Sequence, residues 1–254
     1  MMIGARTAAW AKSGGWVNPY VTDGLVAMWD GEWNAGGGVH ESRAMLTDLV
    51  SGIQNIYNNP DYTMDDNCIV YDVSTTGQTF GAFFPISELT SQSILTYECV
   101  AWFANLKRWG AIYAFTTPNC TLSGEHGSIR FGGLEYSGFP SYINRKYINR
   151  QNQDSIFSIS GTMKNEPWNG SGSRYLHYRY NGTEFYNEVL GGVYADVGVD
   201  GGINILGSND SGSSTYPPTG LFAKLYNLRV YDRVLTPAET AANYAIDKAR
   251  FNLT

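Results

Sequence analysis

The sequence predicts an all-β fold, a sandwich of two antiparallel sheets with a short C-terminal helix. Charged residues make up only 16% of the chain, which has 29 glycines and 18 tyrosines. That composition is typical of short strands joined by many turns. From residue 68 onward, strand-like segments recur about every 8–15 residues, with turn residues between them. We therefore expect one sandwich domain over residues 23–254, preceded by an arm over residues 1–22.

The N-terminal part of the chain is less regular. Residues 1–22 contain Gly, Ser, Ala and two tryptophans without a steady period, so we interpret them as an arm or an edge strand. After the turn at Asp23-Gly24, the apolar run Leu25–Trp29 predicts the first buried strand. A short helix is expected around Ser42–Leu49.

The central and C-terminal parts predict a series of strands. In Ser93–Phe103, alternation places Tyr97 and Cys99 on one face and Glu98 on the other. Asn181-Gly182 predicts a tight hairpin turn, because both residues tolerate positive φ angles. The other expected strands are Cys68–Val73, Gln78–Phe84, Ala111–Thr116, Ser128–Phe131, Asp154–Thr162, Tyr175–Tyr180, Glu184–Val189, Ile203–Leu206 and Leu221–Tyr231.

A helix is expected to close the chain. Thr236-Pro237-Ala238-Glu239 is a capping box with proline at the first helical position. Behind it, small and apolar residues recur at helical spacing and predict the face that lies against a sheet: Ala238, Ala242, Ala245, Ile246 and Ala249.

Two stretches resemble the laminin G-like, concanavalin A-like lectin-glucanase superfamily in its bacterial and phage forms. The first is Asp23–Asp30, an apolar strand ending in an aromatic residue. The second, Phe222–Glu239, is similar to the closing strand of that superfamily and its helix-leading tail. The resemblance covers residues 23–251 and implies a jelly-roll β-sandwich. Its members include sugar-binding domains, adhesion modules, enzyme appendages and virion proteins, so it does not fix a function.

The residues that glycosidases of this sandwich type use are missing from the sequence. Such enzymes carry Glu-x-Asp-x-Glu on one strand, which brings two carboxylates about 5–5.5 Å apart. Here Glu98 stands alone, and Glu184 and Glu188 lie about 13 Å apart along a strand. His40-Glu41 begins like a zinc-protease helix, but Ala44 replaces the second histidine. We therefore expect a protein that is not an enzyme.

Calcium is the one ion that the sequence suggests. Jelly-roll folds hold it through loop carboxylates and carbonyls, for which Asp30, Asp210 and Asp232 are candidates by type. Turn formation explains the same residues equally well. Of the three cysteines, Cys68 and Cys99 fall in apolar strands and are expected to be small core residues.

Aromatic residues in polar loops are the candidates for ligand binding. Trp168 next to Asn169 combines a ring for stacking on a sugar with an amide for its hydroxyls. Trp109 is a further candidate, and so are Tyr136 and Tyr142 in a stretch that could line a groove. The alternative is that these rings cover the sandwich or form a subunit contact.

The charge balance restricts the partners. The net charge is −6 without a basic patch, which argues against nucleic acid. No apolar run is long enough for membrane insertion. With no secretory signal visible, we expect synthesis in the cytoplasm.

These observations favour a non-catalytic recognition or structural protein of a phage virion or a bacterial surface. Its loops would bind carbohydrate or a protein partner. Residues 1–22 would order against a neighbouring subunit in a virion or a homo-oligomer. The alternative is a glycoside hydrolase or lyase with an atypical arrangement of carboxylates.

Overall fold

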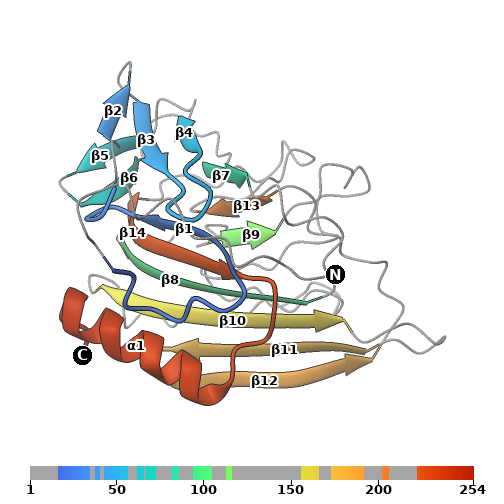
Figure 1. Cartoon of the computed structure of the whole chain (residues 1–254). Helices are drawn as coiled ribbons and strands as arrows, with labels where there is room; N and C mark the ends of the chain where they lie inside the picture. Colours follow the sequence, from blue (N-terminus) through green and yellow to red (C-terminus); the bar gives the residue numbers. More distant parts are fainter. Residues whose placement is uncertain are drawn as a thin grey trace, which may run out of the picture.

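The computed structural model describes twelve segments of the chain, and most of their residues form antiparallel strands (Figure 1). The described residues are 17–34, 38–40, 43–56, 62–65, 67–72, 82–85, 94–104, 113–115, 156–165, 173–191, 202–205 and 222–254. Within them the fold is all-β with one short C-terminal helix, as the sequence predicts.

The largest sheet has eight strands. Seven of them follow one another in the order β12 (Thr183–Gly191), β11 (Ser173–Tyr180), β10 (Phe157–Asn165), β8 (Ile94–Ala104), β14 (Phe222–Tyr231), β6 (Cys68–Asp72) and β5 (Tyr62–Asp65). The eighth, β1 (Leu25–Asp30), pairs with the second half of β14, whose first half pairs with β6. On its other edge β14 pairs with β8, so the predicted closing strand lies inside the sheet.

Two three-stranded sheets lie on the side of the molecule away from the helix (Figure 1). One contains β7 (Ala82–Pro85), β13 (Gly202–Ile205) and β9 (Tyr113–Phe115). The other contains β2 (Gly38–His40), β3 (Arg43–Thr47) and β4 (Gln54–Ile56).

The expected short helix at Ser42–Leu49 is wrong, because residues Arg43–Thr47 form strand β3. Ala44 and Leu46 are buried while Met45 and Thr47 are half-buried, which is the period of two that a strand requires. The expected strand Ser128–Phe131 lies outside the described residues.

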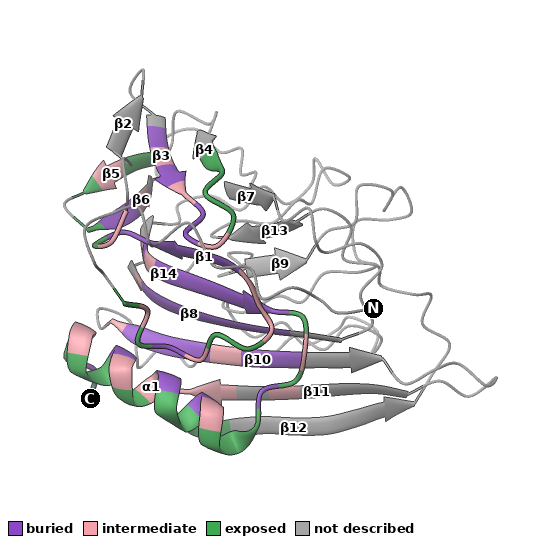
Figure 2. Ribbon diagram, in the orientation of Figure 1, coloured by how far each residue is buried: buried purple, intermediate pink, exposed green. Residues whose placement is uncertain are grey.

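The two faces of the large sheet differ in chemistry. Tyr97, Cys99 and Ile159 point to one face and are buried, and the described parts of β1, β8 and β14 are largely buried (Figure 2). Cys68 and Cys99 are buried free thiols, as expected for small core residues. Glu98 and Ser158 alternate with these residues and therefore point to the opposite face, which α1 covers.

Helix α1 (Pro237–Phe251) begins at the predicted capping box. The Thr236 side chain accepts a hydrogen bond from the Glu239 backbone, and Glu239 accepts one from the Thr236 backbone. The helix ends at Asn252, which has a left-handed φ of 56°.

The predicted sheet-facing side of α1 is wrong. Thr240, Asn243 and Asp247 are the buried residues of the helix, whereas its alanines are exposed and Ile246 is half-buried. The helix faces the polar side of the sheet. Its contacts with the sheet are therefore made by polar side chains and not by the predicted alanines.

Asn181-Gly182 forms the predicted hairpin between β11 and β12, with φ values of 44° and 73°. The Gly182 backbone lies against the ring of Tyr244, so the hairpin end contacts α1. This contact brings the β10–β12 side of the sheet next to the first half of the helix.

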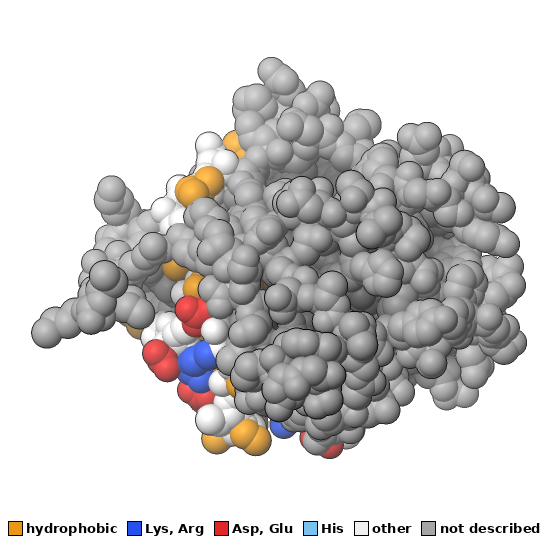
Figure 3. Space-filling view, turned by 90° about the vertical axis from the view of Figure 1, so that its right-hand side faces the viewer, with side chains coloured by type: hydrophobic (Ala, Val, Ile, Leu, Met, Phe, Trp, Pro, Cys, Tyr) orange, Lys and Arg blue, Asp and Glu red, His pale blue; other side chains and the backbone are white. Residues whose placement is uncertain are grey.

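Residues 17–22 run beside the helix. Tyr20 is buried with Met28 and Leu49, and Ile246 of α1 packs against this cluster. Among the described residues, no helix has the length and apolar character needed to cross a membrane. Among the described residues visible in Figure 3, a few acidic and basic side chains lie close together.

Candidate functional site

The polar face of the large sheet is built around Arg229 of β14, which is completely buried. Its Nη1 and Nη2 donate to the two carboxylate oxygens of Asp247 at 2.8 and 2.6 Å. Its Nε donates to Glu98 of β8 at 3.2 Å. Arg229 and Glu98 are register partners on adjacent strands, and Asp247 reaches them from α1.

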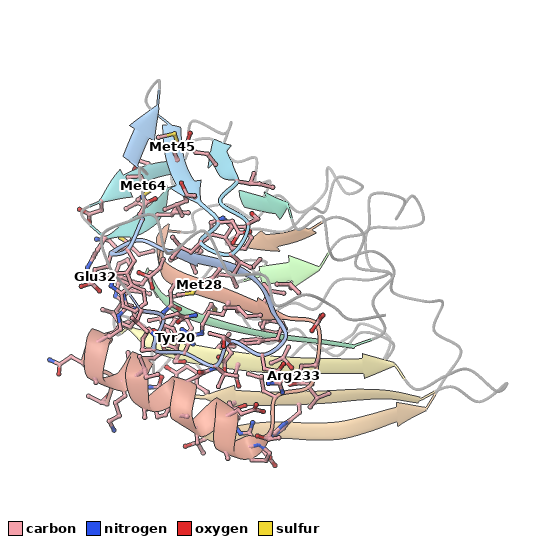
Figure 4. The ribbon with its side chains drawn as sticks, in the orientation of Figure 1. Tyr20, Met28, Glu32, Met45, Met64 and Arg233 are labelled. Carbon is pink, nitrogen blue, oxygen red and sulfur yellow. The ribbon has the colours of Figure 1, made fainter. Side chains whose placement is uncertain are left out.

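Neighbouring polar groups complete this arrangement, which we call the Arg229 cluster. Asn243 donates to Glu98 at 2.7 Å and to the Tyr231 hydroxyl at 3.0 Å. The Tyr20 hydroxyl donates to Asp247 at 2.8 Å, and Figure 4 shows Tyr20 between the sheet and α1. The Arg229 cluster therefore joins β8, β14, α1 and the segment before β1.

One cation in the cluster faces two acids. Burial raises the pKa of Glu98 to about 7, against the lowering effect of the nearby Arg229. Burial lowers the pKa of Arg229, but attraction to Asp247 and its other partners outweighs this and leaves it well above the ordinary value. Except for Glu98, which also borders a shallow depression in the polar face, the cluster is sealed under α1, which suits it to holding the fold together rather than to meeting a ligand.

A second charged group lies at the end of α1. Arg250 donates to Asp30 at 2.7 and 3.0 Å and to Glu32 at 2.7 Å. Its guanidinium lies 3.4 Å from the centre of the Trp33 ring. The carboxylate of Asp30, a calcium candidate from the sequence, is thus engaged by an arginine.

Beside the Arg229 cluster, the polar face opens into a shallow depression. Its lining comes from β8, β10, β11, the hairpin turn and the first half of α1: Glu98, Ser158, Ser160, Arg179, Gly182, Thr240 and Tyr244. Next to it, His177 Nε2 lies 2.6 Å from Glu184 Oε2. Burial lowers the pKa of His177, partly offset by its hydrogen bond to Glu184. Within the part of the surface that the structure describes, this depression is a candidate for ligand contact.

The structure leaves most of the predicted binding residues untested. Trp168, Asn169, Trp109, Tyr136, Tyr142 and Asp210 lie outside the described residues. Asp232 is exposed where β14 leads into the helix. Among the described residues, no group of three or more His, Cys, Asp or Glu side chains could hold a metal ion.

The Arg229 cluster itself was not predicted. Arg229 stands inside an apolar strand, and Asn243 and Asp247 are four apart, on one face of the helix. These two signals could have indicated a buried polar contact between strand and helix. The alanine pattern of the helix obscured them.

Comparisons with known proteins support the fold. No protein-family model matches the sequence, and no curated protein matches it either. Trypanosoma rangeli sialidase matches 90% of this chain with a TM-score of 0.52 and 14% identity. An alginate lyase variant in complex with an alginate tetrasaccharide matches 84% of this chain and 98% of its own, with a TM-score of 0.50 and 10% identity.

At these identities the likeness establishes a shared β-sandwich fold. The chain spans 33% of the length of the sialidase. The laminin G-like assignment within this fold stays a prediction.

The expectation that the protein is not an enzyme is wrong as an inference from this fold. Solved structures that share this fold include a sialidase and an alginate lyase, both carbohydrate-active enzymes. The absence of a Glu-x-Asp-x-Glu strand excludes one glycosidase arrangement and not catalysis by the fold as a whole.

Proposed function

We propose that the protein binds carbohydrate on its β-sandwich. The observation that carries the proposal is the fold shared with two different carbohydrate-active enzymes. One of them has been solved with sialic acid and the other with an alginate tetrasaccharide. Because identity is low and only a third of the sialidase is matched, neither ligand is assigned to this chain.

Two regions are proposed to take part. The segment that carries Trp168 and Asn169 connects β10 to β11, whose ends pair at Asn165 and Arg174. A tryptophan there can stack on a sugar ring. The depression beside Tyr244 offers hydroxyl and guanidinium groups for hydrogen bonds to saccharide oxygens.

The test is a binding assay against immobilised neutral and acidic polysaccharides, with affinity electrophoresis to measure each dissociation constant. Trp168→Ala should weaken binding about tenfold or more, since losing a stacked ring costs roughly 1–3 kcal/mol by analogy with base stacking. Trp168→Phe keeps a ring and should retain part of the affinity.

The same panel of polysaccharides should also be assayed for bond cleavage, because the sialidase and the alginate lyase that share this fold are enzymes. Near-ultraviolet circular dichroism shows whether each variant keeps its tertiary structure. Absence of binding to every polysaccharide by the folded wild-type protein would contradict the proposal. The prediction that the protein belongs to a phage virion or a bacterial surface is tested separately, by identifying the genes that flank its own gene.

A further inference from the structure

Arg179 differs from the other arginines whose side chains the structure describes. Arg229, Arg233 and Arg250 each form ion pairs with carboxylates at 2.6–3.2 Å. In the described part of the chain, the Arg179 guanidinium has neither an ion-pair nor a hydrogen-bond partner. It is half-buried, so its charge is incompletely hydrated.

The strand register makes this more unusual. Glu184 of β12 is the register partner of Arg179 on β11. Its carboxylate instead bonds to His177, two residues along the same strand as Arg179, at 2.6 Å. The acid that could neutralise Arg179 is therefore held by a neighbour, and the guanidinium is left to line the depression.

The depression offers further donors beside Arg179. Ser160 comes from β10 and Thr240 from α1, and in the described structure neither hydroxyl has a hydrogen-bond partner. Tyr244 and Gly182 also line the depression, and the Tyr244 ring packs against the hairpin turn. The enclosed space is about 10 Å³. That is room for about one water-sized group, so only a single small group of a ligand enters the depression.

This chemistry fits a singly charged planar anion. A guanidinium presents two parallel N–H groups that match a carboxylate. Glu98 also lines the depression, and the whole chain has a net charge of −6, so a doubly charged phosphate would meet more repulsion.

We propose that this depression binds the carboxylate of an acidic saccharide, with Arg179 as the charged partner and Ser160 and Thr240 as hydroxyl donors. The proposal rests on the carbohydrate-binding function proposed above and names its ligand class. The sugar ring lies outside the depression, against Tyr244.

The experiment compares oligoglucuronates with neutral cello-oligosaccharides of the same length by isothermal titration calorimetry. The wild-type protein should bind the carboxylated series more tightly. Arg179→Gln should weaken that binding by about tenfold or more, the loss expected for a hydrogen bond to a charged group, and should weaken binding of the neutral ligands much less. Lys248→Gln, which removes the same charge from an exposed site on α1, should have little effect.

Two further variants keep the proposal testable if Arg179→Gln does not fold. Arg179→Lys keeps the charge without the two parallel donors and should bind with intermediate affinity, and Ser160→Ala should bind less tightly than the wild type. Unchanged oligoglucuronate binding by folded Arg179→Gln would overturn the proposal. Binding of neutral saccharides alone would overturn it while leaving carbohydrate binding intact, and binding of neither series would overturn both.

Discussion

Arg229 and Asp247 form a buried pair with two hydrogen bonds, of 2.8 and 2.6 Å, between the central strand β14 and helix α1. Both side chains are fully excluded from solvent. The pair is the main link between the closing strand and the helix that follows it. In the sequence these residues are 18 apart.

Removing one partner of this pair should be costly. Asp247→Asn leaves the buried Arg229 with Glu98 as its remaining acid, so we expect a loss of about 3–5 kcal/mol in the free energy of unfolding. Urea unfolding followed by tryptophan fluorescence measures the change. Asp65→Asn serves as the control, because its ion pair with Lys224 is largely exposed and should contribute about 0–1 kcal/mol. Equal effects of the two substitutions would rule out a special role for the buried pair.

The charge of Glu98 should make stability depend on pH. Burial raises its pKa to about 7 in the folded protein from an ordinary value of 4.5. A raised pKa means that the folded state binds the proton more tightly. The stability that protonation of Glu98 contributes to the folded state is therefore complete below pH 4.5 and is lost as pH rises through about 7.

Glu98→Gln tests this dependence, because glutamine resembles the protonated acid. The variant should gain stability relative to the wild type between pH 5 and pH 8, as measured by urea unfolding at each pH. Asp65→Asn provides the comparison for an exposed acid. A difference between Glu98→Gln and wild type that does not change with pH would show that Glu98 titrates normally.

The sequence predicted those parts of the fold that depend on local patterns. Alternation in β8, the Asn181-Gly182 turn and the capping box at Thr236 each need only a few neighbouring residues. Strand β3 was mistaken for a helix because five residues carry too little periodicity to separate the two.

The candidate site could not be predicted in the same way. The depression combines Ser160, Arg179 and Thr240 from three elements, and only the register and the helix position bring them together. Whether Arg179 has a partner depends on which neighbour Glu184 bonds to. The geometry of the side chains in the folded sheet decides this, and the sequence pattern does not. The polar side of α1 likewise became evident from contacts and not from its alanine pattern.

The Cys99 thiol should be unreactive in the folded protein. Burial raises its pKa to about 12, so almost no thiolate forms at neutral pH. Labelling with a maleimide at pH 7.5, followed by peptide mass mapping, should show modification of Cys99 only after unfolding in urea. Labelling of Cys99 in the native protein at the rate found in urea would mean that the sheet opens readily at β8.

Tyr20 should hold the segment before β1 against the helix. Its hydroxyl donates to Asp247 at 2.8 Å and accepts from Arg250 at 2.8 Å and from Asn227 at 3.3 Å. Tyr20→Phe keeps the ring over Arg229, 3.9 Å from its centre, and removes only these hydrogen bonds. Because buried donors and an acceptor lose their partner, we expect a loss of about 1–3 kcal/mol in the free energy of unfolding.

The same substitution should also loosen residues 17–22 locally. The hydrogen bond from the Val21 backbone to Asn243 then remains as their nearest polar contact with the helix. Limited proteolysis should therefore cut residues 17–22 faster in Tyr20→Phe than in the wild type. Tyr226→Phe is the matched control, because Tyr226 is a half-buried residue whose hydroxyl has no hydrogen-bond partner in the described structure. If both variants were cut at the wild-type rate and unfolded at the wild-type urea concentration, the Tyr20 hydroxyl would have no part in attaching the segment to α1.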